Sequence, residues 1–312
     1  MLYQFQFHSY QRPFKFPLQT SHGTWKVREG ILLQLIDQTG QVGRGEIAPL
    51  PWFGSETLAQ ALDFCRQVPS VFMEDTIFDI PPTLPACQFG FEMAWEQIAG
   101  FRFQVSEFEE QPINSALVQS ALLPAGEGAL SVWKKLWQAG YRTFKWKIGV
   151  EALEIELALL ERLAHDLPKA ARLRLDANGG LSLETAIAYL SVCDRIPIIE
   201  YLEQPLPPSQ LAQMMELSGE YSTPLALDES VATLAQLQDC HTQGWRDIFV
   251  IKPAIAGSPR RLRQFFQVHA IDAVFSSVFE TEIGRQAGLK LAAELGNCDR
   301  AMGYGTEHWF EE

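Results

Sequence analysis

The sequence lacks the features of several large classes of protein. Its 312 residues include 25 Lys and Arg against 38 Asp and Glu, which gives a formal net charge of −13. This excess of acid argues against nucleic acid as a partner, because such binding depends on clustered cations that neutralise phosphates. The sequence also contains no apolar run of about 18 residues, the length that a membrane-spanning helix requires, so we expect no membrane partner.

Cysteines are few, and the pattern of the opening residues does not resemble a targeting signal. The five cysteines are scattered, with no CxxC pair and no adjacent histidine cluster, a pattern typical of reduced thiols rather than of disulfides or a zinc site. The opening segment MLYQFQFHSYQRPFKF alternates polar and apolar residues, so it predicts a first β-strand rather than a signal peptide. We therefore expect a cytoplasmic protein. No feature of the sequence indicates an oligomeric state.

Length and composition allow a substantial folded core. Hydrophobic residues make up 47% of the chain and charged residues 20%, as in ordinary globular proteins. Up to about residue 110, strand-like and helix-like pieces alternate without a fixed period, which indicates an α+β domain. The acidic stretch at 106–112 is typical of a linker, so we expect domains at 1–110 and 111–312. In the first domain we expect strands at 24–37 and 41–47 and helices at 56–65 and 87–98.

The second domain has a regular pattern. Short apolar runs that end in a polar or charged residue recur, and over most of the domain these end residues lie 24 to 29 positions apart. A strand, a helix and their loops need about that length of chain. Helical periodicity fills two of the intervals, at 152–167 and 182–193. Eight such units predict a (β/α)8-type barrel, a modified TIM barrel whose last helix is short or missing and whose active site lies at the C-terminal strand ends. The expected strands are 115–120, 144–149, 173–178, 198–205, 225–230, 248–253, 273–277 and 300–305.

Three acidic residues end three successive strands of this pattern. They are Asp176 in LDAN, Glu203 in EQP and Asp228 in DES. Alone, each is also typical of a helix cap or a strand stop. Together they converge at one side of the barrel mouth, where three uncompensated carboxylates would repel one another. A hard divalent cation resolves that repulsion, and Mg²⁺, with Mn²⁺ as a substitute, suits an all-oxygen ligand set.

Three lysines flank this acidic trio. Lys145 and Lys147 in FKWKIG share one face of the preceding strand, because alternate residues of a strand point the same way, while Trp146 points to the other face. Lys252 in IKP ends the strand after the trio. We interpret the lysine pair as facing an anionic, metal-centred cavity, with a solvated edge strand as the alternative. A second ammonium and a metal lower the pKa of a lysine, so that it is able to accept a proton.

These motifs resemble those of the enolase superfamily, in its muconate-lactonizing-enzyme-like branch. The matching segments are KWK at 145–147, LDAN at 175–178, EQP at 203–205, DES at 228–230 and IKP at 251–253. The resemblance covers the order and spacing of most of the second domain. It implies that the first domain is a cap whose loops close over the barrel mouth, and the C-terminal tail is a candidate contributor to that cap.

Within the branch, two further segments resemble those of the enzymes that remove water from 2-succinyl-6-hydroxy-2,4-cyclohexadiene-1-carboxylate in menaquinone and phylloquinone biosynthesis. They are GRGEIAPLPWFGSET at 43–57, in which Trp52 stands where glycine is frequent, and SSVFETEIG at 276–284. The resemblance implies that Mg²⁺ binds the carboxylate of this small-molecule substrate and stabilises an enediolate. It implies that Lys147 is the base and then the acid of a syn elimination, that Lys252 stacks as a cation on the ring anion, and that Lys145 tunes Lys147.

The resemblance also suggests residues for substrate binding or for support of the metal site. Asn178 is expected to orient Asp176, and Glu229 to orient Lys252. Two serines are expected to bind the succinyl tail. The complete set is Arg174, Asn178, Glu229, Ser276 and Ser277.

Other activities share this scaffold. An N-acylamino acid racemase or dipeptide epimerase would use Lys147 and Lys252 as bases on opposite faces of its substrate. Such epimerases usually carry Asp-x-Asp on the eighth strand, where this chain reads AMGYGTE at 301–307. A muconate cycloisomerase is a third reading. A barrel that only binds a partner is a fourth, and it is disfavoured because no carboxylate or lysine of the set is missing.

Overall fold

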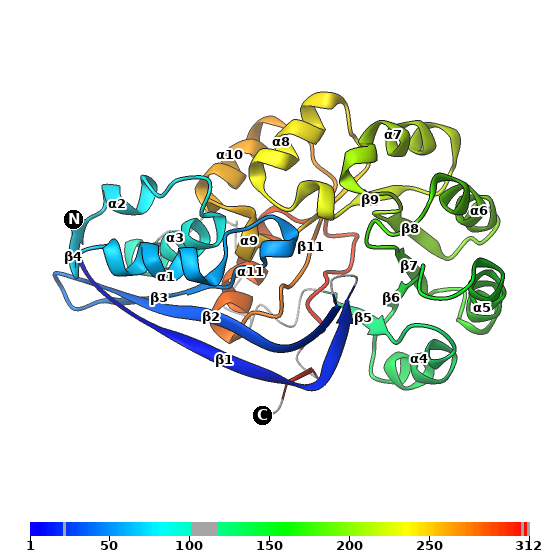
Figure 1. Cartoon of the computed structure of the whole chain (residues 1–312), viewed down its shortest axis with the longest axis horizontal. Helices are drawn as coiled ribbons and strands as arrows, with labels where there is room; N and C mark the ends of the chain where they lie inside the picture. Colours follow the sequence, from blue (N-terminus) through cyan, green and yellow to red (C-terminus); the bar gives the residue numbers. More distant parts are fainter. Residues whose placement is uncertain (21–22, 101–117, 307–308, 311–312) are drawn as a thin grey trace.

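The structure, a computed structural model, describes residues 1–20, 23–100, 118–306 and 309–310. It consists of a capping domain beside a barrel; Figure 1 shows the cap in blue and cyan and the barrel in green, yellow and orange. None of the helices in these described ranges is long and apolar enough to cross a membrane.

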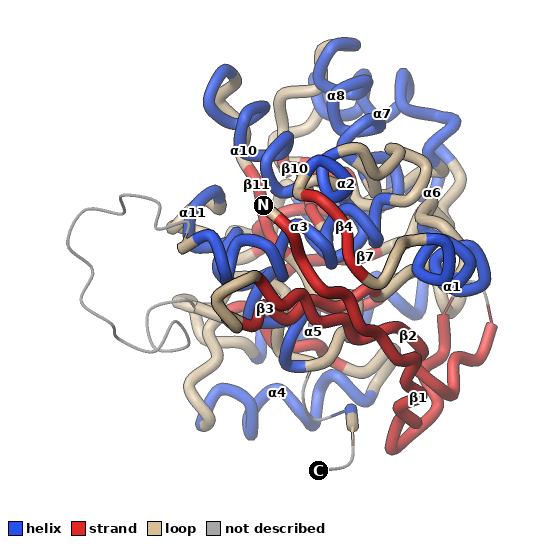
Figure 2. The backbone as a smooth tube through the Cα atoms, turned by 90° about the vertical axis from the view of Figure 1, so that its left-hand side faces the viewer, coloured by secondary structure: helices blue, strands red, loops and turns tan. Residues whose placement is uncertain are grey.

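The capping domain is a four-stranded antiparallel sheet covered by helices on one face. Its strands are β1 (Leu2–Thr20), β2 (Gly23–Asp37), β3 (Val42–Ile47) and β4 (Val71–Met73), in the order β3-β2-β1-β4. Its helices are the 3-10 turn η1 (Pro51–Phe53), α1 (Leu58–Gln67), α2 (Asp75–Phe78) and α3 (Pro85–Ala99). Figure 2 shows β1, β2 and β3 side by side.

Two glycines on β3 bring α3 unusually close to the sheet. A Cβ atom at Gly43 would lie 1.8 Å from the Ala94 carbonyl oxygen, and one at Gly45 would lie 1.9 Å from the Gly90 carbonyl oxygen. Only glycine fits where two backbones approach this closely. Because strand residues alternate, the residues between and after these glycines point to the opposite face of the sheet, which turns one of them, Glu46, toward the barrel.

The barrel sheet contains seven parallel strands within the described ranges. They are β5 (Ser120–Leu123), β6 (Thr143–Lys147), β7 (Arg172–Asp176), β8 (Ile199–Glu203), β9 (Leu225–Leu227), β10 (Ile248–Ile251) and β11 (Ala273–Phe275), hydrogen-bonded in that order. The helices are α4 (Gly128–Gln138), α5 (Leu153–Asp166), α6 (Leu183–Cys193), α7 (Leu211–Glu220), α8 (Leu234–Gln243), α9 (Pro253–Ala256), α10 (Pro259–Val268) and α11 (Glu282–Leu295); two 3-10 turns, η3 (Pro208–Gln210) and η4 (Glu229–Val231), accompany them.

The eighth strand is reduced to two bridges that close the cylinder. Met302 pairs with Gln119 beside β5, and Gly303 pairs with Ser276 beside β11. A short strand suffices here because the backbone of this segment bonds to both neighbours, with Ser120 N donating to the Met302 carbonyl oxygen at 2.8 Å and Gly303 N to that of Phe275 at 2.8 Å.

The predicted fold class is confirmed, with differences at individual elements. The helices expected at 152–167 and 182–193 correspond to α5 and α6, and Ser182 caps α6 by accepting a hydrogen bond from Thr185 N at 3.2 Å. The first predicted barrel strand, 115–120, lies in part outside the described residues; from residue 118 onward, the strand begins at Ser120 rather than earlier. The predicted domain boundary near residue 110 lies outside the described residues.

The two domains are joined by packing and by a buried ion pair. Arg263 of α10 donates to Glu96 of α3, and its Nε donates to Glu294 of α11 at 2.7 Å. All three side chains are less than 10% exposed. The C-terminal tail also reaches the cap, where Phe310 forms an antiparallel bridge with Phe14 of β1.

Candidate active site

The polar residues predicted at the strand ends lie on neighbouring strands of the barrel. Lys147 at the end of β6 is the cross-strand partner of Asp176 on β7, which is in turn the partner of Glu203 on β8. Asp228 follows β9 and Lys252 follows β10. The C-terminal ends of five successive strands therefore present three carboxylates and the flanking lysines to one end of the barrel.

Lys145 joins two of the carboxylates. Its Nζ lies 2.8 Å from Asp176 Oδ2 and 2.7 Å from Glu203 Oε1. Burial on its own would lower the pKa of Lys145, but the charges of Asp176, Glu203 and Asp228 outweigh it and raise that pKa well above its ordinary value. With the carboxylates alone, the shift thus runs opposite to the lowering that we expected for these lysines. Lys145 is held as a cation.

Lys252 is enclosed between the barrel and the cap. Its ammonium donates a hydrogen bond to Asp228, and it lies 4.1 Å from the centre of the Phe53 ring, which belongs to η1 of the cap. A cation over an aromatic face is attracted to the ring electrons. Phe53 thereby brings the cap directly over the barrel mouth, and this contact was not among the sequence predictions.

Glu203 is the most enclosed of the three carboxylates. Its side chain is 1% exposed, and Oε2 has no hydrogen-bond partner among the described residues. Burial raises the pKa of Glu203 well above its ordinary value, with the charges of Asp176 and Asp228 adding to that effect and Lys145 opposing it. An unpaired buried carboxylate oxygen is costly, so this atom is suited to a positive ligand.

The acidic trio is not a ready-made metal cage. Within the described ranges, no three Asp, Glu, His or Cys side chains are grouped closely enough to hold a metal ion. The ammonium of Lys145 lies between Asp176 and Glu203, and that of Lys252 is bonded to Asp228. A divalent cation that bound all three carboxylates would have to replace these ammonium contacts.

Lys147 differs from the other two lysines because it makes no hydrogen bond or ion pair with the described residues. It lies on the same face of β6 as Lys145 and is half-buried, whereas Phe144 and Trp146 are fully buried on the other face. Ile148 is also buried. The predicted burial of one face of this strand is therefore confirmed, and the amine of Lys147 stands beside the carboxylates without a partner.

Asn178 and Glu229 support the trio in a way that was only partly expected. Asn178 donates its backbone N–H to Asp176 Oδ1 at 3.1 Å, as the prediction of an orienting role requires. Its side-chain amide donates to Glu229 Oε1 at 3.1 Å. Glu229 was expected to orient Lys252, but its hydrogen bond goes to Asn178 instead. Burial, reinforced by the charges of Asp228 and Asp176, raises the pKa of Glu229 to about 7.

Arg174 lies deeper in the barrel than its predicted role suggests. It is 1% exposed, and its Nε donates to Glu200 Oε2 at 2.7 Å while its guanidinium lies 4.9 Å from the centre of the Tyr201 ring. Arg300 reaches the other oxygen of Glu200 at 3.0 Å. Arg174 therefore belongs to a buried ionic layer, in which its Nε and Nη2 both donate to Glu200.

The two serines on the loop after β11 are already engaged. Ser276 Oγ donates to the Gly303 carbonyl oxygen at 3.3 Å, and Ser277 Oγ donates to Glu280 Oε2 at 2.9 Å. Thr306 Oγ1 lies 3.4 Å from Ser277 Oγ. Substrate binding by these serines stays a prediction.

Gln204 is a further supporting residue that the sequence analysis missed. Its Oε1 accepts hydrogen bonds from Asp228 N at 2.9 Å and from Ser230 N at 3.1 Å, and its Nε2 donates to Ser230 Oγ at 2.7 Å. It is fully buried and has a positive φ of 36°. Gln204 thus fixes the turn that carries Asp228. The only available signal was its place next to Glu203.

Comparison with known proteins defines the class first. Residues 129–312 match the family described as "Enolase C-terminal domain-like", and residues 2–98 match "MenC, N-terminal domain". The chain therefore combines an enolase-type barrel with a cap of the MenC N-terminal type. Other solved structures share only the fold with this chain. An L-Ala-D/L-Glu epimerase from Bacillus subtilis, for example, matches with a TM-score of 0.80 and 20% identity over 99% of this chain and 91% of that one.

The particular family follows from nearer relatives. An o-succinylbenzoate synthase of Thermosynechococcus vestitus is 41% identical over 310 residues, which cover 98% of this chain and 93% of that protein. The crystal structure of o-succinylbenzoate synthase from Thermosynechococcus elongatus BP-1, with magnesium in its active site, matches with a TM-score of 0.89 and 39% identity over 99% of this chain and 94% of that one. The chain belongs to the o-succinylbenzoate synthase family.

Proposed function

We propose that this protein is a carbon-oxygen lyase that dehydrates 2-succinyl-6-hydroxy-2,4-cyclohexadiene-1-carboxylate to 2-succinylbenzoate in the cytoplasm, for quinone biosynthesis. The observation that carries the proposal is the amine of Lys147, which has no partner among the described residues and lies beside a buried acidic trio, in a chain that is 41% identical to an o-succinylbenzoate synthase over nearly its whole length. A small carboxylate substrate suits a mouth that contains three lysines.

The acidic trio fits a magnesium ion. All three side chains offer carboxylate oxygens, the ligands that Mg²⁺ prefers, and Glu203 Oε2 is buried without a partner among the described residues. Asp176, Glu203 and Asp228 would hold the ion. Mn²⁺ would serve as a substitute for Mg²⁺ at the same carboxylates. When bound, it would act as a Lewis acid that draws electron density from the substrate carboxylate.

In the proposed reaction, Lys147 moves the proton. In its neutral form, its Nζ removes the proton α to the substrate carboxylate, and the electron pair of that C–H bond passes into the conjugated ring. The C–O bond at position 6 then breaks, and the departing hydroxide takes the same proton from the Lys147 ammonium and leaves as water. One residue on one face of the ring thus performs a syn elimination of water, and the amine of Lys147 is neutral again at the end.

The other two lysines act as fixed cations. The ammonium of Lys252 would be displaced from Asp228 by a metal ion on that carboxylate, and Lys252 then needs only to keep its charge over the ring while negative charge develops there. Lys145 keeps its proton because the charges of Asp176, Glu203 and Asp228 favour its cationic form. As a cation, it helps to hold the substrate carboxylate beside the acidic trio. Neither role requires these lysines to exchange protons.

Two substrates distinguish this function from racemisation on the same scaffold. Purified protein with Mg²⁺ is mixed with the cyclohexadiene, and the loss of diene absorbance is followed together with the appearance of 2-succinylbenzoate. In parallel, an N-succinylamino acid is incubated in D₂O and its α-deuteration is measured. We expect rapid dehydration; rapid α-deuteration with no loss of the diene would replace the proposal by a racemase.

A further inference from the structure

One buried carboxylate of the cap contacts the barrel at a loop next to the site. Glu46 of β3 is 1% exposed. It accepts hydrogen bonds from Thr281 N at 2.9 Å and Gly284 N at 2.9 Å, and the Thr281 hydroxyl also donates to it. Thr281 is the N-cap of α11, so a cap-domain carboxylate satisfies the free N–H groups at the start of a barrel helix.

The cap is shaped around this contact. Tyr10 of β1 donates its hydroxyl to Glu46, and its ring crosses Gly30 of β2, where an added Cβ would lie 2.6 Å from the Tyr10 hydroxyl oxygen. Glycine at position 30 therefore leaves room for the Tyr10 ring to reach Glu46. On the barrel side, a Cβ at Gly284 would lie 2.8 Å from Glu46 Oε2. Glycine therefore stands on both sides of the contact: Gly30 leaves room for the Tyr10 ring, and Gly284 leaves room for the Glu46 carboxylate.

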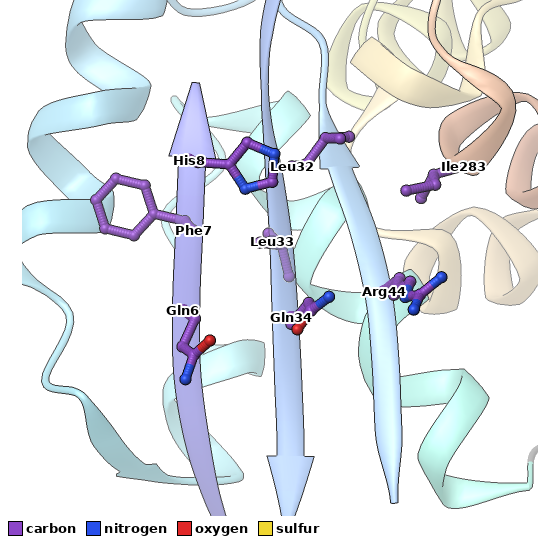
Figure 3. Close-up of a pocket in the computed structure, with 8 residues that line it drawn as sticks. All are labelled: Gln6, Phe7, His8, Leu32, Leu33, Gln34, Arg44 and Ile283. Atoms are coloured by element: carbon purple, nitrogen blue, oxygen red, sulfur yellow. The ribbon is translucent and has the colours of Figure 1, made fainter. Parts of the chain in front are cut away.

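The contact is local rather than part of a continuous packed face. The neighbouring row of this sheet face carries Gln6, Gln34 and Arg44, which line an open depression of about 450 Å³ beside Ile283 of α11 (Figure 3). None of the predicted site residues lines this depression. The hydrogen bonds of Glu46 link this face of the sheet to the first turn of α11 at one point.

The segment just before Thr281 carries the two serines. Glu280, the residue before Thr281, accepts hydrogen bonds from Ser277 Oγ at 2.9 Å and from Val278 N at 2.6 Å. These bonds connect Ser277 to the end of the loop that Glu46 contacts. Phe279 between them has a φ of 62°, a conformation that a bulky side chain rarely adopts. Its ring packs edge-on against Phe14 and Trp25 of the cap, at 5.5 and 5.6 Å.

We propose that Glu46 is a positioning residue that fixes the loop from Ser276 to Thr281 against the cap and thereby sets the affinity for the succinyl tail of the substrate. The proposal rests on the proposed function, because it assigns that tail to this loop. Glu46 touches neither the carboxylate trio nor the lysines, so it acts on binding through the loop and leaves the chemical step alone.

The test uses a variant from each side of the contact and a matched control. Glu46→Gln removes the charge, and Gly284→Ala crowds the carboxylate from the barrel side. Glu92→Gln is the control, because Glu92 is another buried cap carboxylate that accepts a backbone N–H, that of Arg260 at 3.0 Å, at the start of a different barrel helix. We measure kcat and KM in saturating Mg²⁺, and amide hydrogen exchange at Thr281 and Gly284.

We expect Glu46→Gln and Gly284→Ala to raise KM about tenfold or more while kcat changes less than about threefold, as loss of uniform binding predicts. Exchange at Thr281 and Gly284 is expected to accelerate in Glu46→Gln and to stay slow in Glu92→Gln. Unchanged KM in both test variants, or an equal rise in Glu92→Gln, overturns the proposal. If the wild-type protein fails to dehydrate the diene, the proposed function fails, and the exchange experiment still decides whether Glu46 fixes the loop.

Discussion

Replacement of Lys147 separates proton transfer from charge. Lys147→Ala removes the amine, whereas Lys147→Arg keeps a cation whose pKa lies above 12, so that it stays protonated and accepts nothing. If Lys147 is the base, both variants lose activity. If its role is only to attract an anionic substrate, Lys147→Arg retains most of it. The pair of variants therefore tests the chemical role directly.

The structure sets the size of the expected effects. General base catalysis contributes about 10²- to 10⁴-fold, so kcat should fall by at least about 10²-fold in both variants, which is about 3 to 5 kcal/mol of transition-state stabilisation. Lys147 is half-buried and has no ion-pair partner among the described residues. Its removal leaves no buried charge unpaired, so the free energy of unfolding should change by less than about 1 kcal/mol.

Lys145→Met provides the contrast. It removes the ammonium that joins Asp176 and Glu203, and it leaves two buried carboxylates unpaired. Stability should fall by about 3 kcal/mol or more in the absence of Mg²⁺. Stopped-flow loss of diene absorbance gives kcat, and urea denaturation gives stability. More than about a tenth of wild-type kcat in Lys147→Arg would refute the assignment of Lys147 as the base.

Three further predictions concern groups around the site. Arg263→Met should lower the free energy of unfolding by about 3 to 5 kcal/mol, because Glu96 and Glu294 lose their buried partner; Arg66→Met, at an exposed pair with Asp63, should cost less than about 1 kcal/mol, and equal losses in urea denaturation would count against this ranking. Gln204→Leu should weaken Mg²⁺ binding about 10- to 100-fold in calorimetry, because the turn that carries Asp228 loses its hydrogen bonds; unchanged affinity would exclude this support. Burial, with the charge of Glu46 adding to it, raises the pKa of Glu280 to about 7 from 4.5. Between those pH values the unfolded chain releases this proton first, so stability should fall as pH rises, by at most about 3 kcal/mol from this group. Glu229, whose pKa is also raised to about 7, adds a slope of the same sign, so Glu280→Gln should remove part of the slope, and an unchanged slope would assign all of it to other groups.

The residues at the strand ends were predictable because the pattern that defines them lies within short segments of the sequence. Apolar runs at βα spacing predict parallel strands, and neighbouring parallel strands bring their last residues to one rim. Asp176 and Glu203 accordingly end the neighbouring strands β7 and β8, and Lys252 follows β10, two strands further along the sheet. The helices α5 and α6 followed from their 3.6-residue period. The eighth strand was expected at 300–305, and two backbone bridges at Met302 and Gly303 stand there.

The choice of partner for each side chain was not predictable. Glu229 bonds to Asn178 rather than to Lys252 because several donors lie within reach, and only the folded geometry selects among them. Arg174 is drawn to Glu200, the residue that a register shift between β7 and β8 leaves without a cross-strand partner, and no strand pattern reveals that shift. Glu46 and Phe53 act across the two domains, and contacts between distant segments leave no periodic signal in the sequence.

The central claim is that one divalent cation bound by Asp176, Glu203 and Asp228 works beside the amine of Lys147. The direct measurement is to strip the protein with chelator, titrate Mg²⁺ by calorimetry, and follow diene loss at each Mg²⁺ concentration. We predict one Mg²⁺ per chain, activity that rises in step with its binding, and loss of both in Glu203→Gln. Full diene turnover by the stripped protein, or unaltered Mg²⁺ binding in Glu203→Gln, would contradict the claim.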